Sequence, residues 1–147
     1  MNKFAKILLA TALSSVHMYG YCDQEIYIVA RTIYLEARGE PYEGKMAVAS
    51  VIYNRANGNS DEFASVCLAP GQFACWRKEN IGKLKILNAV DRRALMECVS
   101  ISKSMFKKDF RPTIDATHYY NPKLASPSWG SEMKGAIYIG NHKFGKL

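Results

Sequence analysis

Residues 29–55 read VARTIYLEARGEPYEGKMAVASVIYNR, and this stretch decides the fold. Apolar residues recur at helical spacing around its first half: Ile26, Val29, Ile33 and Ala37. Gly39 ends a helix in a left-handed turn, and Pro41 opens the next one, where a missing N–H costs nothing. We therefore expect two helices, 23–38 and Tyr42–Arg55, packed as a short-linked pair.

Glu36 lies in the last turn of the first of these helices. The negative end of the helix dipole and any burial both disfavour a carboxylate, so both favour the protonated acid. A protonated carboxylic acid is the donor that a glycosidic oxygen needs when its bond breaks. The alternative for a lone helix-terminal glutamate is a surface ion pair, here with Arg31 or Arg38.

The whole stretch resembles the catalytic core of the SleB/CwlJ family of cell-wall hydrolases. The family signature is close to E-A-R-G-E-P-x-x-G-x-x-A-V-A-x-V-x-x-N-R, and no residue of that pattern is missing here. T-H-Y-Y-N-P at 117–122 and I-G-N-H-x-F at 139–144 also look like family elements, whereas Ile114 and Asp115 stand where many relatives carry glycines. The resemblance implies an α+β fold, mainly helical and lysozyme/lytic-transglycosylase-like, with the catalytic acid at Glu36.

The resemblance also implies a substrate, the peptidoglycan glycan strand, cut between N-acetylmuramic acid and N-acetylglucosamine. In a lytic transglycosylase one acid suffices: Glu36 protonates the leaving oxygen and then accepts the proton of the muramic C6 hydroxyl, leaving a 1,6-anhydro end. A hydrolytic muramidase or glucosaminidase would need a second carboxylate, for which Glu40, Glu43 and Asp61 are nearby. Glu40 and Glu43 suit the first turn of the second helix better, so we favour the transglycosylase. A non-catalytic peptidoglycan-binding module is the alternative from another class.

Six further residues are candidates for substrate binding, through amides and aromatic faces: Gln72, Phe73, Tyr119, Tyr120, Asn121 and Trp129. Gln72 and Phe73 match a G-Q-F or K-Q-F element that borders the cleft in the family. For Phe73, packing inside its loop is an equal alternative. We expect His118 to be exposed and His142 to be structural or to orient a neighbour.

The N-terminal residues 1–22 have the layout of a secretory signal peptide. Lys3 and Lys6 precede an apolar run, 7–13, that is too short for an ordinary membrane span. Residues 18–22 match the small-x-small pattern of a cleavage site only imperfectly, so an uncleaved membrane anchor is the alternative. We expect one catalytic domain, 23–147, that is monomeric, exported to the periplasm or secreted, and touches a membrane only through an uncleaved leader.

The chain is basic, and removal of Lys3 and Lys6 would lower its net charge only from +7 to about +5. A positive field concentrates polyanions such as cell-wall polymers. Nucleic acid is disfavoured because no dense Lys/Arg stripe with interleaved aromatics is present. We expect no metal and no cofactor, because no C-x-x-C or paired-histidine motif occurs.

Four cysteines in a chain with a leader suggest disulfides: Cys22, Cys67, Cys75 and Cys98. A Cys67–Cys75 bridge would staple the short loop between them, and Cys22 with Cys98 would be the remaining pair. The alternative is that they are buried free thiols, above all Cys98.

The rest of the chain predicts a short helical turn through Phe63 and Leu68, capped by Ser60 or Asp61, and a long helix over 84–108. The candidate core positions of the long helix are Ile86 or Leu87, Val90, Ala94, Cys98 or Val99, Ile101 or Ser102, and Met105. Residues 116–120, 136–139 and 142–144 suit strands, and Gly140-Asn141 is a two-residue hairpin signal. Three short strands would form a small antiparallel sheet.

Overall fold

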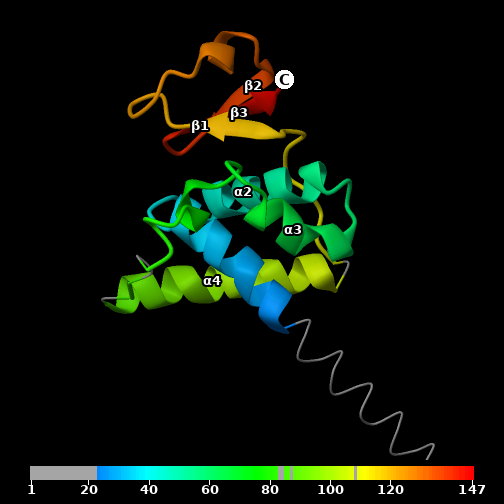
Figure 1. Cartoon of the computed structure of the whole chain (residues 1–147), viewed down its shortest axis with the longest axis vertical. Helices are drawn as coiled ribbons and strands as arrows, with labels where there is room; N and C mark the ends of the chain where they lie inside the picture. Colours follow the sequence, from blue (N-terminus) through cyan, green and yellow to red (C-terminus); the bar gives the residue numbers. More distant parts are fainter. Residues whose placement is uncertain (1–22, 83–84, 87, 108) are drawn as a thin grey trace, which may run out of the picture.

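The structure is a computed structural model that describes residues 23–82, 85–86, 88–107 and 109–147. The predicted signal peptide, with Cys22, lies outside these residues. Helices form the body of the molecule, and a small sheet with its loops covers one end of that body (Figure 1). Within the described residues, no helix combines the length and apolarity needed to cross a bilayer.

The predicted helix pair is confirmed, although Gly39 does not adopt the left-handed conformation expected of it. Residues 23–37 are helical, and α2 spans Tyr42–Arg55 with Pro41 at its N-cap. Both helices bury apolar side chains in one core: Val29, Ala30, Ile33, Tyr34 and Ala37 from the first, and Ala47, Val48, Val51 and Ile52 from α2. Burying a side chain the size of Ile33 contributes about 1.5–3 kcal/mol, so this shared face holds the pair together.

A short helical segment follows, as predicted, in two pieces: η1 (Ser60–Glu62) and α3 (Phe63–Leu68). The cap differs from the prediction, because the Asn59 side chain accepts the hydrogen bond from the Asp61 N–H. The ring of Phe63 packs on Tyr53 of α2 and on Phe106 of α4, with centroid distances of 5.8 and 5.5 Å. Aromatic packing therefore fixes this segment against the body.

The long helix α4 spans Ala89–Phe106 and begins later than predicted. Asn88 is the cause, because its side chain accepts a hydrogen bond of 2.9 Å from the Asp91 N–H and starts the helix there. Lys85 and Ile86 are not helical. Ala94, Cys98 and Met105 are buried as predicted, whereas Val90 is 75% exposed, so that core assignment is wrong. Ile86 is 44% exposed, and its alternative, Leu87, is not among the described residues. The expected helical residues 84, 87 and 108 lie outside the described part of the chain.

The sheet has three antiparallel strands in the order β1-β3-β2, as predicted: β1 (His118–Tyr120), β2 (Lys134–Ile139) and β3 (His142–Lys146). Two 3-10 turns complete the fold, η2 (Ala74–Trp76) and η3 (Ser128–Ser131). Gly140 turns the β2–β3 hairpin with a φ of +59°, in the region that favours glycine. A Cβ atom there would also collide with the carboxylate of Glu40.

Polar contacts tie the sheet to the helical body. The Asn54 side-chain amide donates to the carbonyls of Ile114 and Ala116, at 3.0 and 2.9 Å. The Glu40 carboxylate accepts bonds from the backbone and side-chain N–H groups of Asn141, at 3.0 and 3.1 Å. Glu40 therefore anchors the hairpin, and its predicted role in the first turn of α2 is wrong.

The predicted Cys67–Cys75 disulfide is wrong for this structure, which holds both residues, and Cys98, as buried free thiols. Cys67 faces the core from α3 and Cys75 from η2. Burial raises the pKa of each of these thiols to about 12. Because only the thiolate starts disulfide chemistry, enclosure in the core keeps them unreactive.

Candidate active site

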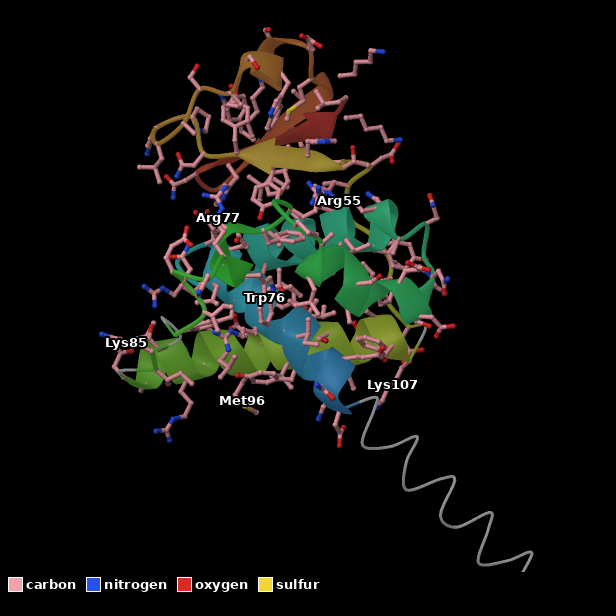
Figure 2. All side chains as sticks on the ribbon, viewed as in Figure 1. Arg55, Trp76, Arg77, Lys85, Met96 and Lys107 are labelled. Carbon is pink, nitrogen blue, oxygen red and sulfur yellow. The ribbon has the colours of Figure 1, made fainter. Side chains whose placement is uncertain are left out.

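An open cleft of about 610 Å³ lies where the helical body meets the sheet. The helical body contributes Glu36 and Arg55, the loop around η2 contributes Gln72 and Arg77, and the sheet side contributes residues of β1 and β3. Figure 2 shows Arg55 and Arg77 at this seam, between the sheet and the helices. Glu36 is the one carboxylate among the described residues that line the cleft.

Glu36 reaches the cleft because it sits at the end of the first helix, one residue before the buried Ala37. Its side chain is half-buried, and Oε2 accepts a hydrogen bond of 2.9 Å from the Tyr119 hydroxyl. The Cys75 thiol lies near Glu36, and burial, together with the charge of Glu36, raises the pKa of the thiol. A neutral donor from the sheet thus holds the carboxyl group in place.

Tyr119 is fixed on the sheet side of the cleft. Its ring stacks on Phe144, with centroids 5.3 Å apart, and meets the His142 ring edge-on at 5.4 Å. Burial, and then the neighbouring charge of Glu36, raise the pKa of Tyr119 well above its usual value of 10. The phenol therefore remains a hydrogen-bond donor to Glu36 throughout the physiological pH range.

Arg55, the last residue of α2, stands beside Glu36 and Tyr119. Its Nε donates to the Thr117 carbonyl at 2.7 Å, and its guanidinium lies 5.2 Å above the centre of the Phe73 ring. Burial lowers the pKa of Arg55, and the nearby Tyr119, Cys67 and Glu36 oppose that shift. The cleft floor therefore combines an acid with a fixed cation.

The far wall of the cleft is aromatic. Trp129 meets the rings of Tyr120 and His118 edge-on, each at 5.6 Å. His118 also contacts the Thr117 hydroxyl through Nδ1 at 2.9 Å. Burial, and then the charge of Arg55, lower the pKa of His118. His118 is half-buried in the wall, so the expectation that it is simply exposed is wrong.

Five of the six predicted binding residues line the cleft with Glu36: Gln72, Tyr119, Tyr120, Asn121 and Trp129. Phe73 does not. It is 3% exposed and packs in the core beneath Arg55, so the packing alternative describes it and its predicted contact with substrate is wrong.

Four basic residues that line the cleft were not among the predicted site residues: Arg55, Arg77, His118 and His142. Arg55 carried a signal, since it closes the family pattern, but its partner Thr117 is far away in sequence. His142 was expected to orient a neighbour. It contacts the Tyr119 ring, and its Nδ1 lies 3.6 Å from Glu40 Oε1.

The other acids near Glu36 in sequence do not line this cleft. The Glu40 side chain is 7% exposed and bonded to Asn141. Glu43 is exposed on the first turn of α2, and Asp61 lies beside Glu25 in a separate hollow. Neither retaining nor inverting hydrolysis has its second carboxylate among the described residues of the cleft.

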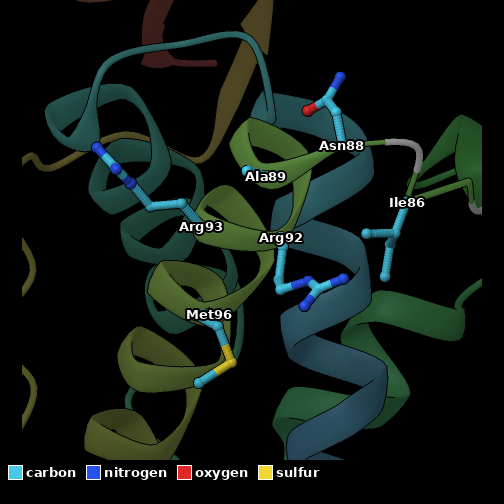
Figure 3. A pocket seen from close by; sticks show the side chains of 6 residues that line it. All are labelled: Ile86, Asn88, Ala89, Arg92, Arg93 and Met96. Atoms are coloured by element: carbon cyan, nitrogen blue, oxygen red, sulfur yellow. The ribbon is translucent and has the colours of Figure 1, made fainter.

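A second pocket, of about 550 Å³, lies beside the start of α4 (Figure 3). Its walls are Ile86, Asn88, Ala89, Arg92, Arg93 and Met96, with no carboxylate among them. Unlike this pocket, the cleft at Glu36 brings an acid, hydrogen-bond donors and several aromatic faces together.

A mainly helical α+β domain with one glutamic acid in an open aromatic cleft defines a lysozyme-like fold and site. Residues 39–145 match the cell wall hydrolase family, and the chain belongs to that family. The resemblance to SleB/CwlJ enzymes is thereby confirmed, although the matched range begins just after Glu36.

Curated relatives agree with this assignment. The chain is 34% identical over 127 residues to the spore cortex-lytic enzyme of Halalkalibacterium halodurans, covering 85% of this chain and 36% of the relative. It is 31% identical over 145 residues to the spore cortex-lytic enzyme of Bacillus subtilis, covering 97% of this chain and 44% of the relative. The chain thus spans less than half the length of these relatives.

Two solved structures are similar over most of the fold. One is the catalytic domain of the germination-specific lytic transglycosylase SleB from Bacillus anthracis, with a TM-score of 0.59 and 30% identity over 83% of this chain and 93% of that one. The other is the catalytic domain of Bacillus cereus SleB, with a TM-score of 0.60 and 29% identity over 84% of this chain and 91% of that one. The likeness therefore extends over more than nine tenths of each of those catalytic domains.

Proposed function

We propose that this domain cleaves the glycan strand of peptidoglycan between N-acetylmuramic acid and N-acetylglucosamine, as a lytic transglycosylase with Glu36 as its general acid and base. The main support is that Glu36 is the one carboxylate among the described residues that line the cleft. A transglycosylase needs one acid, whereas ordinary hydrolysis needs two. The named activity of the Bacillus anthracis SleB domain supports the same reaction.

The reaction proceeds in two proton transfers at Glu36. First the Glu36 proton moves to the glycosidic oxygen, and the C1–O bond breaks with its electron pair on the leaving sugar. The muramic C6 hydroxyl then bonds to C1 and gives its proton to Glu36, which restores the acid. Tyr119 donates to the same carboxyl group, 2.9 Å from Oε2, and keeps it oriented through both steps.

Substrate recognition falls to the aromatic and amide groups of the wall. Tyr120 and Trp129 offer ring surfaces for successive sugars, and Gln72 and Asn121 offer amides for their hydroxyl and acetamido groups. Arg55 and Arg77 make the cleft cationic, which suits a wall polymer that carries carboxylates.

Such a substrate lies outside the cytoplasm, so we propose that the domain acts after export, in the periplasm or as a secreted protein, as the leader at 1–22 predicts. The spore cortex-lytic relatives also carry names that refer to an extracytoplasmic wall.

Digestion of purified cell walls, followed by mass spectrometry of the muropeptides, tests the proposal. We expect 1,6-anhydro products, each lighter by one water than the hydrolysed fragment, and none from the Glu36→Gln protein. Glu43→Gln, an exposed acid outside the cleft, is the matched control and should digest normally. Wall binding without fragments would identify a binding module instead, and hydrolysed ends would identify a muramidase or glucosaminidase.

A further inference from the structure

Arg55 carries a charge that the protein does not neutralise. No carboxylate of the described residues lies within ion-pair distance of it. Its Nη1 is buried and has no hydrogen-bond acceptor. Burying a guanidinium without a bonded anion is costly, so a role in the anchoring of the sheet alone does not explain this residue.

The Arg55 side chain is nevertheless held rigidly. The Nε bond to Thr117 fixes one edge of the guanidinium at 2.7 Å, and the buried Phe73 ring supports its face at 5.2 Å. Both supports come from elements other than α2, so they fix the charge relative to the cleft. A fixed charge in a partly dry site acts more strongly than one on a mobile surface side chain.

Glu36 is within the electrostatic reach of this fixed charge, together with Tyr119 and Cys67. We propose that Arg55 is a positioning residue for Glu36: its charge stabilises the carboxylate that Glu36 becomes after giving up its proton. That carboxylate then takes the proton of the C6 hydroxyl. The inference deepens the proposed function and rests on it.

The other groups that face Glu36 do not supply this charge. Tyr119 from β1, Cys75 from η2 and Cys67 from α3 are neutral donors or thiols, since burial raises the pKa of all three. The other basic residues that line the cleft are His118 of β1, His142 of β3 and the exposed Arg77. Burial lowers the pKa of His118, which favours its neutral form. Among the described arginines of the cleft, Arg55 is the one that is half-buried and anchored by a hydrogen bond, from its Nε to Thr117.

The test compares the wild type with Arg55→Gln and Arg55→Lys, with kcat and KM measured on soluble glycan strands across pH. Arg55→Gln should lower kcat about 10- to 100-fold with little change in KM. The alkaline limb of the kcat profile should move up by about one pH unit, because without the cation Glu36 holds its proton more tightly. Because Arg55→Lys keeps a positive charge, its fall in kcat and its shift of the alkaline limb should each be at most half of those in Arg55→Gln. Arg93→Gln, on α4 away from the cleft, is the matched control and should change neither (Figure 3).

A second arm protects the test against misfolding. Arg55→citrulline keeps the Nε–H and the planar group over Phe73 but removes the charge, so it should reproduce the Gln phenotype in a folded protein. An unshifted pH limb in the citrulline protein, or a Lys variant as impaired as Gln, would overturn the inference and leave Arg55 as a structural anchor.

A readout independent of turnover separates this inference from the proposed function. Carbon-13 NMR of the labelled Glu36 carboxyl should show its titration midpoint about one pH unit higher in the citrulline protein than in the wild type. If wild-type protein gave no anhydro product but the midpoint moved, the proposed function would fail and the coupling would stand. If anhydro product formed and the midpoint stayed, only the coupling would fail.

Discussion

The helical body and the sheet face each other across the cleft, and they contribute different chemistry. The body supplies groups that carry or exchange charge, Glu36 and Arg55, each at the end of a helix whose other face is buried. The sheet supplies a neutral hydroxyl, from Tyr119, and much of the aromatic wall. In the proposed mechanism, proton transfer therefore depends on the packed helix pair, and recognition depends largely on the sheet and its loops.

The largest effect is expected from Glu36→Gln, which removes the acid of the helical body and keeps the shape of its side chain. We expect kcat to fall at least about a thousand-fold, because general acid catalysis is lost, while the thermal unfolding midpoint stays within a few degrees. Loss of turbidity of purified walls and circular dichroism measure the two quantities. Lysis at the wild-type rate would mean that Glu36 is not the acid.

Tyr119→Phe tests what the sheet contributes to Glu36, because it removes only the hydroxyl that donates to the carboxylate. The ring still packs on Phe144, so stability should change by no more than about 1 kcal/mol. We expect kcat to fall about 10-fold, because Glu36 loses a donor that orients it. Steady-state kinetics on glycan strands check this. A rise in KM with kcat unchanged would place Tyr119 in recognition rather than in proton transfer.

Trp129→Ala probes the recognition wall alone. Removing one stacking face should raise KM about three- to tenfold and leave kcat within about twofold. The same kinetic assay measures both, and Tyr138→Ala, which removes an exposed aromatic ring of β2 outside the cleft, is the matched control. A fall in kcat with KM unchanged would instead mean that Trp129 supports the proton-transfer step at Glu36.

The smallest effect is expected from reducing agents. The described cysteines are free thiols, so dithiothreitol should change neither the melting temperature nor the activity. With a pKa of about 12, only about one Cys75 in ten thousand is ionised at pH 8, so iodoacetamide should react with it far more slowly than with a free thiol. A drop in melting temperature on reduction would reveal a disulfide.

Local signals predicted the helix pair almost to the residue. Gly39 and Pro41 mark the break between the helices, and the spacing of apolar residues gives the buried face of each. The β2–β3 hairpin could be predicted equally well, because Gly140-Asn141 is a turn signal by itself. Where neighbouring residues determine the backbone conformation of a segment, the sequence alone predicts its structure.

Contacts between residues far apart in the sequence could not be predicted in the same way. The contacts of Glu40 with Asn141 and of Arg55 with Thr117 join residues far apart in the chain. Neighbours in one loop, Gln72 and Phe73, face opposite ways, one into the cleft and the other into the core. Spacing suggested a Cys67–Cys75 bridge but does not tell where either thiol points. These features depend on how the elements dock, which no local pattern encodes.

Digestion of walls in water enriched with oxygen-18 tests the central claim most directly. If the muramic C6 oxygen bonds to C1 and gives its proton to Glu36, the new ends are 1,6-anhydro sugars that carry no heavy oxygen. Reducing ends that contain oxygen-18 as the main product of the wild-type protein would contradict the account, because water would then be the nucleophile.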